Sequence, residues 1–120
     1  MTVDTLFPIL RTTDLDRLVR FYEEAFDGDV RYRFAPEGRD VYVSLAVGGG
    51  TVGVGFEPDA ARGDAIALWI YTDSADRAFA RAVDAGAAPV SAPEDTAWGE
   101  RMAQVRDPDG NLLYLAVASA

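Results

Sequence analysis

The chain has 120 residues, 49% of them hydrophobic, a formal net charge of −9, and neither histidine nor cysteine. That length fits one domain, which can bury a core without disulfides or metals. The missing imidazole and thiol groups argue against zinc, non-haem iron, copper, haem and iron–sulfur sites, and against nucleophilic mechanisms that use a histidine base.

The charge and the apolar pattern also bear on partners and location. A negative surface repels nucleic-acid phosphates, whereas it favours solubility, a cationic small molecule or a basic partner. No apolar run approaches the roughly 20 residues of a membrane span. The first residues, Met1 to Asp4, lack the basic and apolar segments of a signal peptide. We therefore expect a cytoplasmic protein that binds neither nucleic acid nor membranes.

The first half of the chain predicts one helix among four strands. Apolar residues from Leu15 to Phe26 recur at helical spacing, with Thr13 or Asp14 as the cap and Gly28 at the end. The segments around this helix are rich in Val, Tyr, Phe and Leu and predict strands. These strands are Leu6–Arg11, Asp29–Phe34, Val41–Val47 and Thr51–Glu57. Gly48–Gly50 forms the last turn; it precedes no helix and lacks a lysine, so it is not a phosphate loop.

The second half predicts the same order. Ala75 to Val83 repeats the helical spacing, with Asp73 or Ser74 as the cap and Gly86 as the stop. The segments that predict strands are Ala65–Tyr71, Pro89–Ser91, Arg101–Arg106 and Leu112–Val117. We expect a single domain over 1–120, with one module at 1–57, a linker at 58–64 and a second module at 65–120.

The two halves align with a constant shift. Asp16 and Asp76 are 60 residues apart, and so are Gly50 and Gly110, each of which precedes a strand. One shift across helix and sheet indicates a duplicated β-α-β-β-β module.

Four stretches carry a resemblance to a known family. They are Arg11–Arg17 with Phe21 and Tyr22, Ala82–Ala87, Trp98–Arg101, and the turn Asp107–Asn111. In this order and with the repeat, the chain resembles the glyoxalase/bleomycin-resistance/extradiol-dioxygenase superfamily, also called the vicinal oxygen chelate fold. The resemblance spans nearly the whole chain. It implies an α+β fold in which two tandem βαβββ modules form a curled mixed sheet with a U-shaped groove.

The resemblance also implies where a metal would bind. Superfamily ligands lie on the first and last strands of each module, and the matching positions here are Phe7, Val54, Ala67 and Tyr114. None is a histidine or glutamate, so we expect no metal and no cofactor. The resemblance that remains is to the metal-free bleomycin-resistance branch, whose acidic proteins sequester bulky and usually cationic drugs.

If these four positions face the groove, as the resemblance implies, strand alternation gives the rest of the lining, because alternate side chains share one face. The expected groove residues on the first and last strands are Phe7, Ile9, Arg11, Val52, Val54, Phe56, Ala67, Trp69, Tyr71, Leu112, Tyr114 and Ala116. The third strands add Tyr42, Ser44, Ala46, Met102, Gln104 and Arg106. These aromatics could stack on planar rings or cations, or else fill the groove or a dimer interface.

One loop aromatic and several acids lie near the expected groove mouth. Trp98 either closes over the groove or covers a sheet edge, and Gly99 lets its loop turn. Glu57, Asp95 and Glu100 are the nearest acids, but their spacing singles out no acid–base pair. Glu100 gains no support from its neighbour Arg101, because adjacent strand residues point to opposite faces.

The sequence therefore favours a metal-free small-molecule binding or sequestering protein, for example for a cationic antibiotic or secondary metabolite, and we expect a homodimer. The alternative is a metal-free lyase, isomerase or cyclase with Tyr114 or a groove carboxylate as proton carrier. As a proton carrier, Tyr114 would need a phenol pKa below its ordinary value of about 10. A dimer with a degenerate groove also stays open.

Overall fold

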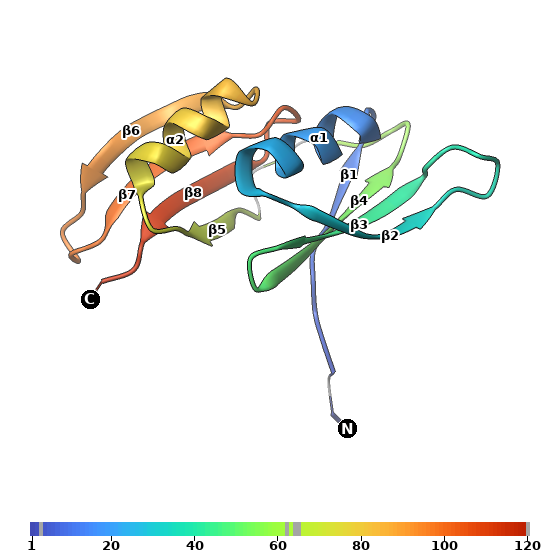
Figure 1. The fold of residues 1–120 in the computed structure, drawn as a ribbon, viewed down its shortest axis with the longest axis horizontal. Coiled ribbons are helices and arrows are strands. Elements are labelled where there is room, and N and C mark those ends of the chain that lie inside the picture. Colours follow the sequence, from blue (N-terminus) through green and yellow to red (C-terminus); the bar gives the residue numbers. More distant parts are fainter. Residues whose placement is uncertain (3, 62, 64–65, 120) are drawn as a thin grey trace. The chain divides into compact units, whose positions relative to one another are not determined.

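The computed structural model describes residues 1–2, 4–61, 63 and 66–119 (Figure 1). The chain divides into two compact units, Met1–Ala61 and Arg62–Ala120. Each unit runs strand, helix and three strands. This confirms the α+β class and the two βαβββ modules. The boundary falls inside the segment expected as a linker, while Asp64 and Ala65, at the ends of the expected linker and strand, lie outside the described residues.

Each unit is a four-stranded mixed sheet with one helix. The first unit contains β1 (Ile9–Thr12), α1 (Leu15–Phe26), β2 (Asp29–Phe34), β3 (Tyr42–Val47) and β4 (Gly50–Phe56), in the sheet order β1-β4-β3-β2. The second contains β5 (Leu68–Tyr71), α2 (Ala75–Asp84), β6 (Ala88–Asp95), β7 (Arg101–Arg106) and β8 (Leu112–Val117), in the order β5-β8-β7-β6. The outer pairs β1–β4 and β5–β8 are parallel, and the other pairs are antiparallel.

Both helices begin at capping residues among those expected. The side chains of Asp14 and Ser74 accept hydrogen bonds from the third backbone N–H of their helices. At the end of α1, Asp27 adopts a left-handed conformation, and Gly28 N–H bonds the Tyr22 carbonyl at 3.0 Å. A Cβ atom on Gly28 would lie 2.8 Å from that carbonyl oxygen, so this close approach requires glycine.

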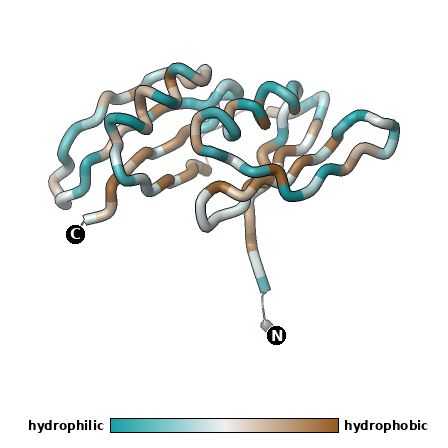
Figure 2. The backbone as a smooth tube through the Cα atoms, viewed as in Figure 1, coloured by the Kyte–Doolittle hydropathy of each residue, from teal (hydrophilic) through white to brown (hydrophobic). Residues whose placement is uncertain are grey.

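The helix of each unit covers one face of its own sheet, and the core lies between them (Figure 1). Hydrophobic residues follow the central strands, as Figure 2 shows for both units. The strand residues with no exposed surface include Val43, Leu45, Val54, Ala103, Val105, Leu113 and Leu115. Alternation leaves the opposite face of each sheet uncovered by its helix.

The register of β4 corrects one expectation. Val54 pairs with Val43, Val52 pairs with Leu45, and all four side chains are buried on the face that α1 covers. The prediction that Val52, Val54 and Phe56 face the opposite side is therefore wrong. Gly53 and Gly55 hold those positions, because they pair with Ser44 and Tyr42.

The cause is a change of shift within the repeat. Ile9 pairs with Gly53 in the first unit, and Trp69 pairs with Tyr114 in the second. Equivalent residues of the two units are therefore 60 positions apart on the first strands but 61 apart on the last strands. The connection before β8 spans 107–111, whereas only Gly48 and Gly49 separate β3 from β4. A one-residue slip moves every side chain of a strand to the other face.

Several strand ends also differ from expectation. β1 begins at Ile9 and β5 at Leu68, so Phe7 and Ala67 lie before their strands and are exposed. Pro8 supplies its carbonyl to Gly53 N–H at 2.9 Å but has no N–H of its own to donate. β6 is longer than the expected 89–91 and runs to Asp95. No helix in the described part of the chain is long and apolar enough to span a membrane.

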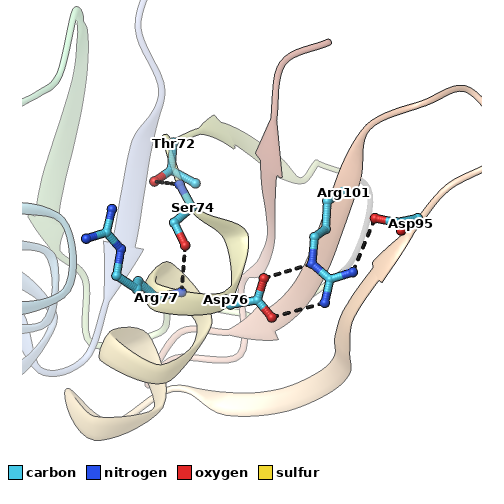
Figure 3. A network of polar contacts seen from close by, with 6 residues as sticks. All are labelled: Thr72, Ser74, Asp76, Arg77, Asp95 and Arg101. Carbon is cyan, nitrogen blue, oxygen red and sulfur yellow. Dashed lines mark hydrogen bonds and ion pairs between the residues drawn. The ribbon is translucent and has the colours of Figure 1, made fainter. Parts of the chain in front are cut away.

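Arg101 attaches α2 to its sheet. It donates from Nε and Nη2 to both carboxylate oxygens of Asp76 in the first helical turn, at 2.7 and 3.0 Å, and from Nη1 to Asp95 at 3.2 Å (Figure 3). These bonds lower the pKa of Asp76 and raise that of Arg101. Arg101 therefore belongs to the helix-covered face of β7, and its neighbours along the strand turn to the opposite face.

The β4 register can be tested by Val54→Ala. Because Val54 is fully buried, the substitution should lower the free energy of unfolding by about 2 kcal/mol. Ser44→Ala, on the uncovered face, should change it by less than about 0.5 kcal/mol. Urea unfolding followed by circular dichroism compares them. Equal effects would place Val54 on the uncovered face and contradict the register.

Candidate functional site

The uncovered face of the second sheet gathers many of the expected site residues. We call the side of β5, β8 and β7 opposite α2 the open face. Trp69, Tyr114 and Gln104 lie side by side in register across the three strands, and so do Tyr71, Ala116 and Met102. Leu112 and Arg106 form the next row, and Glu100, directly before β7, continues the same alternation as Met102. The open face thus combines aromatic surface with a few polar groups, which is typical of small-molecule sites.

Three aromatic rings form the centre of the open face. The Trp69 and Tyr114 rings stack with centroids 5.2 Å apart and an interplanar angle of 22°. The Tyr71 ring meets Trp69 edge-on at 5.9 Å. Trp69 is 43% exposed and Tyr71 57% exposed, so a planar ligand can reach both rings. Such surfaces favour offset stacking with another ring.

Glu100 organises the edge of this aromatic group. Its Oε2 accepts a hydrogen bond from the Tyr71 hydroxyl at 2.9 Å, and its Oε1 accepts one from the Trp98 indole Nε1 at 3.0 Å. Glu100 is only 8% exposed, yet both donors are mostly exposed aromatic side chains. The carboxylate therefore fixes two rings, one on β5 and one in the β6–β7 connection.

The backbone around Glu100 is closed by Thr96. The Thr96 N–H and hydroxyl both donate to the Glu100 carbonyl, at 2.9 and 2.6 Å, and Glu100 N–H donates back to the Thr96 hydroxyl at 3.2 Å. Gly99 completes the turn at a φ of 94°, where other residues would be strained. This closed turn gives the Trp98 indole a defined position at the face.

Tyr71 is electrostatically coupled to Glu100. The hydrogen bond to Glu100 raises the pKa of the Tyr71 phenol, and partial removal from solvent and the charge of Glu100 raise it further. The Trp69 contact acts weakly in the opposite direction. Tyr71 therefore remains a protonated donor at neutral pH.

Several other polar side chains that were expected near the groove are engaged elsewhere. Arg106 donates to the Gly110 carbonyl at 2.9 Å and so participates in its own hairpin. Asp95 binds Arg101 on the opposite face, and Glu57 lies 3.6 Å from Arg11 in the first unit. The Tyr114 hydroxyl makes no hydrogen bond to any described residue.

The first unit carries a different face. Tyr42 lies across β4, where a Cβ atom on Gly53 would come within 2.5 Å of the Tyr42 hydroxyl and 3.1 Å of Ile9. Tyr42 also lies 6.2 Å from the Tyr32 ring. Ile9, Arg11 and Tyr42 thus share the expected face, whereas Val54 and Phe56 do not.

The sequence predicts Glu100 near the groove mouth but not among the residues that line the groove. Alternation placed Met102, Gln104 and Arg106 together, and one further step back would have added Glu100. The sequence does not show that Tyr71 and Trp98 reach the same carboxylate, because Tyr71 lies 29 positions from Glu100 and the direction of the Trp98 side chain depends on the fold of its turn.

Comparison with known proteins agrees with this architecture. Residues 3–115 match the model of the Glyoxalase/Bleomycin resistance protein/Dioxygenase superfamily. The chain belongs to this superfamily. It is 31% identical over 118 residues to the uncharacterized protein Mb0911c of Mycobacterium bovis, an alignment that covers 88% of this chain and 78% of that protein.

Solved structures show the same superfamily fold. TioX from Micromonospora sp. ML1 is 28% identical, with a TM-score of 0.76 and coverage of 96% of this chain and 98% of TioX. The bleomycin resistance determinant encoded on the transposon Tn5 is 24% identical, with a TM-score of 0.74 and coverage of 98% and 100%. At that identity the second likeness establishes the fold alone.

The metal that superfamily members can bind does not fit the residues of this chain. The side chains of Phe7 and Ala67 have no atoms that can bind a metal. The register places Gly53, not Val54, at the third expected ligand position, and glycine has no side-chain donor either. The Tyr114 ring is stacked on Trp69. Among the residues described, no three His, Cys, Asp or Glu side chains gather into a group that could hold a metal ion.

Glu100→Gln tests the coupling to Tyr71. Removing the carboxylate should lower the Tyr71 pKa toward about 10. Because the Tyr71 pKa is raised, the folded state holds this proton more tightly than the unfolded state does. The contact therefore stabilises the fold at pH values below the ordinary tyrosine pKa, and this stabilisation is lost as the pH rises through the folded-state pKa. The pH titration is followed by ultraviolet absorbance for wild type and for Glu100→Gln. Subtracting the curve of the same protein with Tyr71→Phe leaves the titration of the Tyr71 phenol. An unchanged Tyr71 titration would contradict the contact.

Proposed function

We propose that this protein binds and sequesters a planar organic molecule on the open face of the second unit, without a metal and without converting it. The stacked pair Trp69–Tyr114, bordered by Tyr71 and Trp98, carries the proposal. Exposed aromatic surface of this kind is costly in water and marks binding sites. Rings held by packing and by Glu100 lose little conformational entropy when a ligand stacks on them.

The superfamily relatives suggest a ligand class. Residues 3–115 match the Glyoxalase/Bleomycin resistance protein/Dioxygenase superfamily, and its bleomycin resistance members support an antibiotic or secondary metabolite as the ligand of this chain. The net charge of −9 favours a cationic one. A homodimer stays a prediction, and the exposed Ile9, Tyr32 and Phe34 of the first unit would suit such an interface.

One observation favours the alternative of a metal-free lyase, isomerase or cyclase. The Tyr71–Glu100 pair places a phenol and a buried carboxylate at the edge of the aromatic group, and such groups can carry protons. Glu100 is a more suitable proton carrier than Tyr114, whose hydroxyl binds no described residue. Binding without reaction is nevertheless the simpler account, because both Glu100 oxygens already hold the aromatic donors.

Trp69→Leu and Tyr114→Phe separate stacking from hydroxyl chemistry. With naphthalene carboxamide as a planar neutral probe, Trp69→Leu should weaken binding about tenfold by removing the stacked ring. Tyr114→Phe keeps its ring and should stay within about twofold of wild type. Titration calorimetry measures both.

The matched control is Phe56→Leu, which removes an aromatic of similar exposure from the first unit. It should leave the affinity unchanged. Equal losses in Trp69→Leu and Phe56→Leu would contradict a site on the open face. Conversion of the probe by wild type, abolished in Glu100→Gln, would favour the enzyme instead.

The protein should also contain no stoichiometric transition metal when it is purified without a tag. The reason is its donor set, which includes neither histidine nor cysteine. Elemental analysis by mass spectrometry provides the measurement. Close to one equivalent of zinc, iron, nickel or manganese per chain would overturn the metal-free assignment.

A further inference from the structure

Glu100 is a buried carboxylate that forms no ion pair with any described residue. It is 8% exposed, and its hydrogen bonds come from the neutral Tyr71 hydroxyl and the neutral Trp98 indole. No arginine among the described residues pairs with it. A buried charge without a counterion is unfavourable, so this arrangement needs an explanation.

The first unit provides an internal comparison. Asp40 lies 60 residues before Glu100. The same shift relates Ser44 on β3 to Gln104 on β7, the equivalent strand of the second unit. Asp40 forms an ion pair with Arg33. The counterpart acid is thus neutralised in one module and left with neutral donors in the other.

The arginines closest in sequence to Glu100 are committed elsewhere. Arg101 turns to the opposite face of β7, where it binds Asp76 and Asp95. Arg106 donates to the Gly110 carbonyl. Among the described residues of the second unit, these two arginines serve the helix and the hairpin, and no arginine pairs with Glu100.

We propose that Glu100 is the specificity-determining residue of the ligand site, and that it selects ligands with a positively charged planar nitrogen group such as an amidinium or guanidinium. This inference rests on the proposed function, since the ring system of the ligand must lie against Trp69 and Tyr114. An ionised carboxylate has about four acceptor positions, and only two are occupied here. The bordering aromatic rings favour a cation further through their π faces.

A series of three probes with one ring system tests the charge preference. Naphthalene carboxamidine is cationic, naphthalene carboxamide is neutral, and naphthalene carboxylate is anionic. The amidinium should bind wild type at least about tenfold more tightly than the amide, because a charge-assisted contact replaces a neutral one. The carboxylate should bind most weakly. Both tryptophans of the chain border the open face, so tryptophan fluorescence reports each titration.

Two variants assign the preference to one residue. Glu100→Gln should remove most of the amidinium advantage, at least about fivefold, and change the amide affinity by less than about threefold. Glu23→Gln is the matched control, because this exposed acid on α1 of the first unit also removes one negative charge from the net −9 and lies outside the open face. It should keep the amidinium advantage. Circular dichroism confirms that both variants fold.

The outcomes separate this inference from the proposed function. If no probe binds wild type, the open face is not a ligand site and both proposals fail. If the amide binds and the amidinium is not preferred, selection by Glu100 is wrong and the stacking site stands. Equal loss of preference in both variants would assign the effect to the overall field of the protein and overturn the role of Glu100. The wild-type series decides the charge preference even if Glu100→Gln fails to fold.

Discussion

The carboxylate of Glu100 holds Tyr71 and Trp98 through one hydrogen bond to each oxygen. These contacts join strand β5 to the β6–β7 connection across the edge of the sheet. They border the stacked pair Trp69–Tyr114 with two further rings, and the Thr96 turn fixes the backbone from which Glu100 projects. Without this carboxylate, two large exposed side chains would be free to adopt other rotamers, and their ordering would oppose binding.

The alternation of β7 separates residues of the core from residues of the proposed binding site. Arg101, Ala103 and Val105 face α2, where they supply the ion pairs and buried contacts of the second core. Glu100, Met102 and Gln104 face the other way. A change on one face can therefore alter binding with little effect on the core, and the reverse holds for the other face. The residues that carry the proposed binding site can therefore vary while the core of the superfamily fold is kept.

Much of the fold could be predicted because it depends on local patterns. Helical spacing and capping residues gave α1 and α2, and Asp14 and Ser74 are both among the expected caps. The error at Val54 arose because Gly50 and Gly110 were treated as equivalent, although Gly50 begins its strand and Gly110 lies within a hairpin. Register depends on hairpin length, which a constant shift ignores.

The site was less predictable because its decisive contacts are not local. The resemblance placed Tyr114 in the groove, and strand alternation from the matching first-strand position added Trp69 and Tyr71. The role of Glu100 depends on which side chains reach it and on which arginines do not. Arg33 forms an ion pair with the counterpart acid Asp40, whereas no described cation pairs with Glu100. Such differences between two copies of one module become visible only when side chains are placed in space.

Chemical-shift mapping of the backbone amides and indole N–H groups with bound naphthalene carboxamide tests the central claim most directly. The account predicts that both indole signals and the amides of β5, β7 and β8 shift, while those of α2 stay in place. Shifts confined to α2 or to residues of the first unit would contradict a ligand site on the open face.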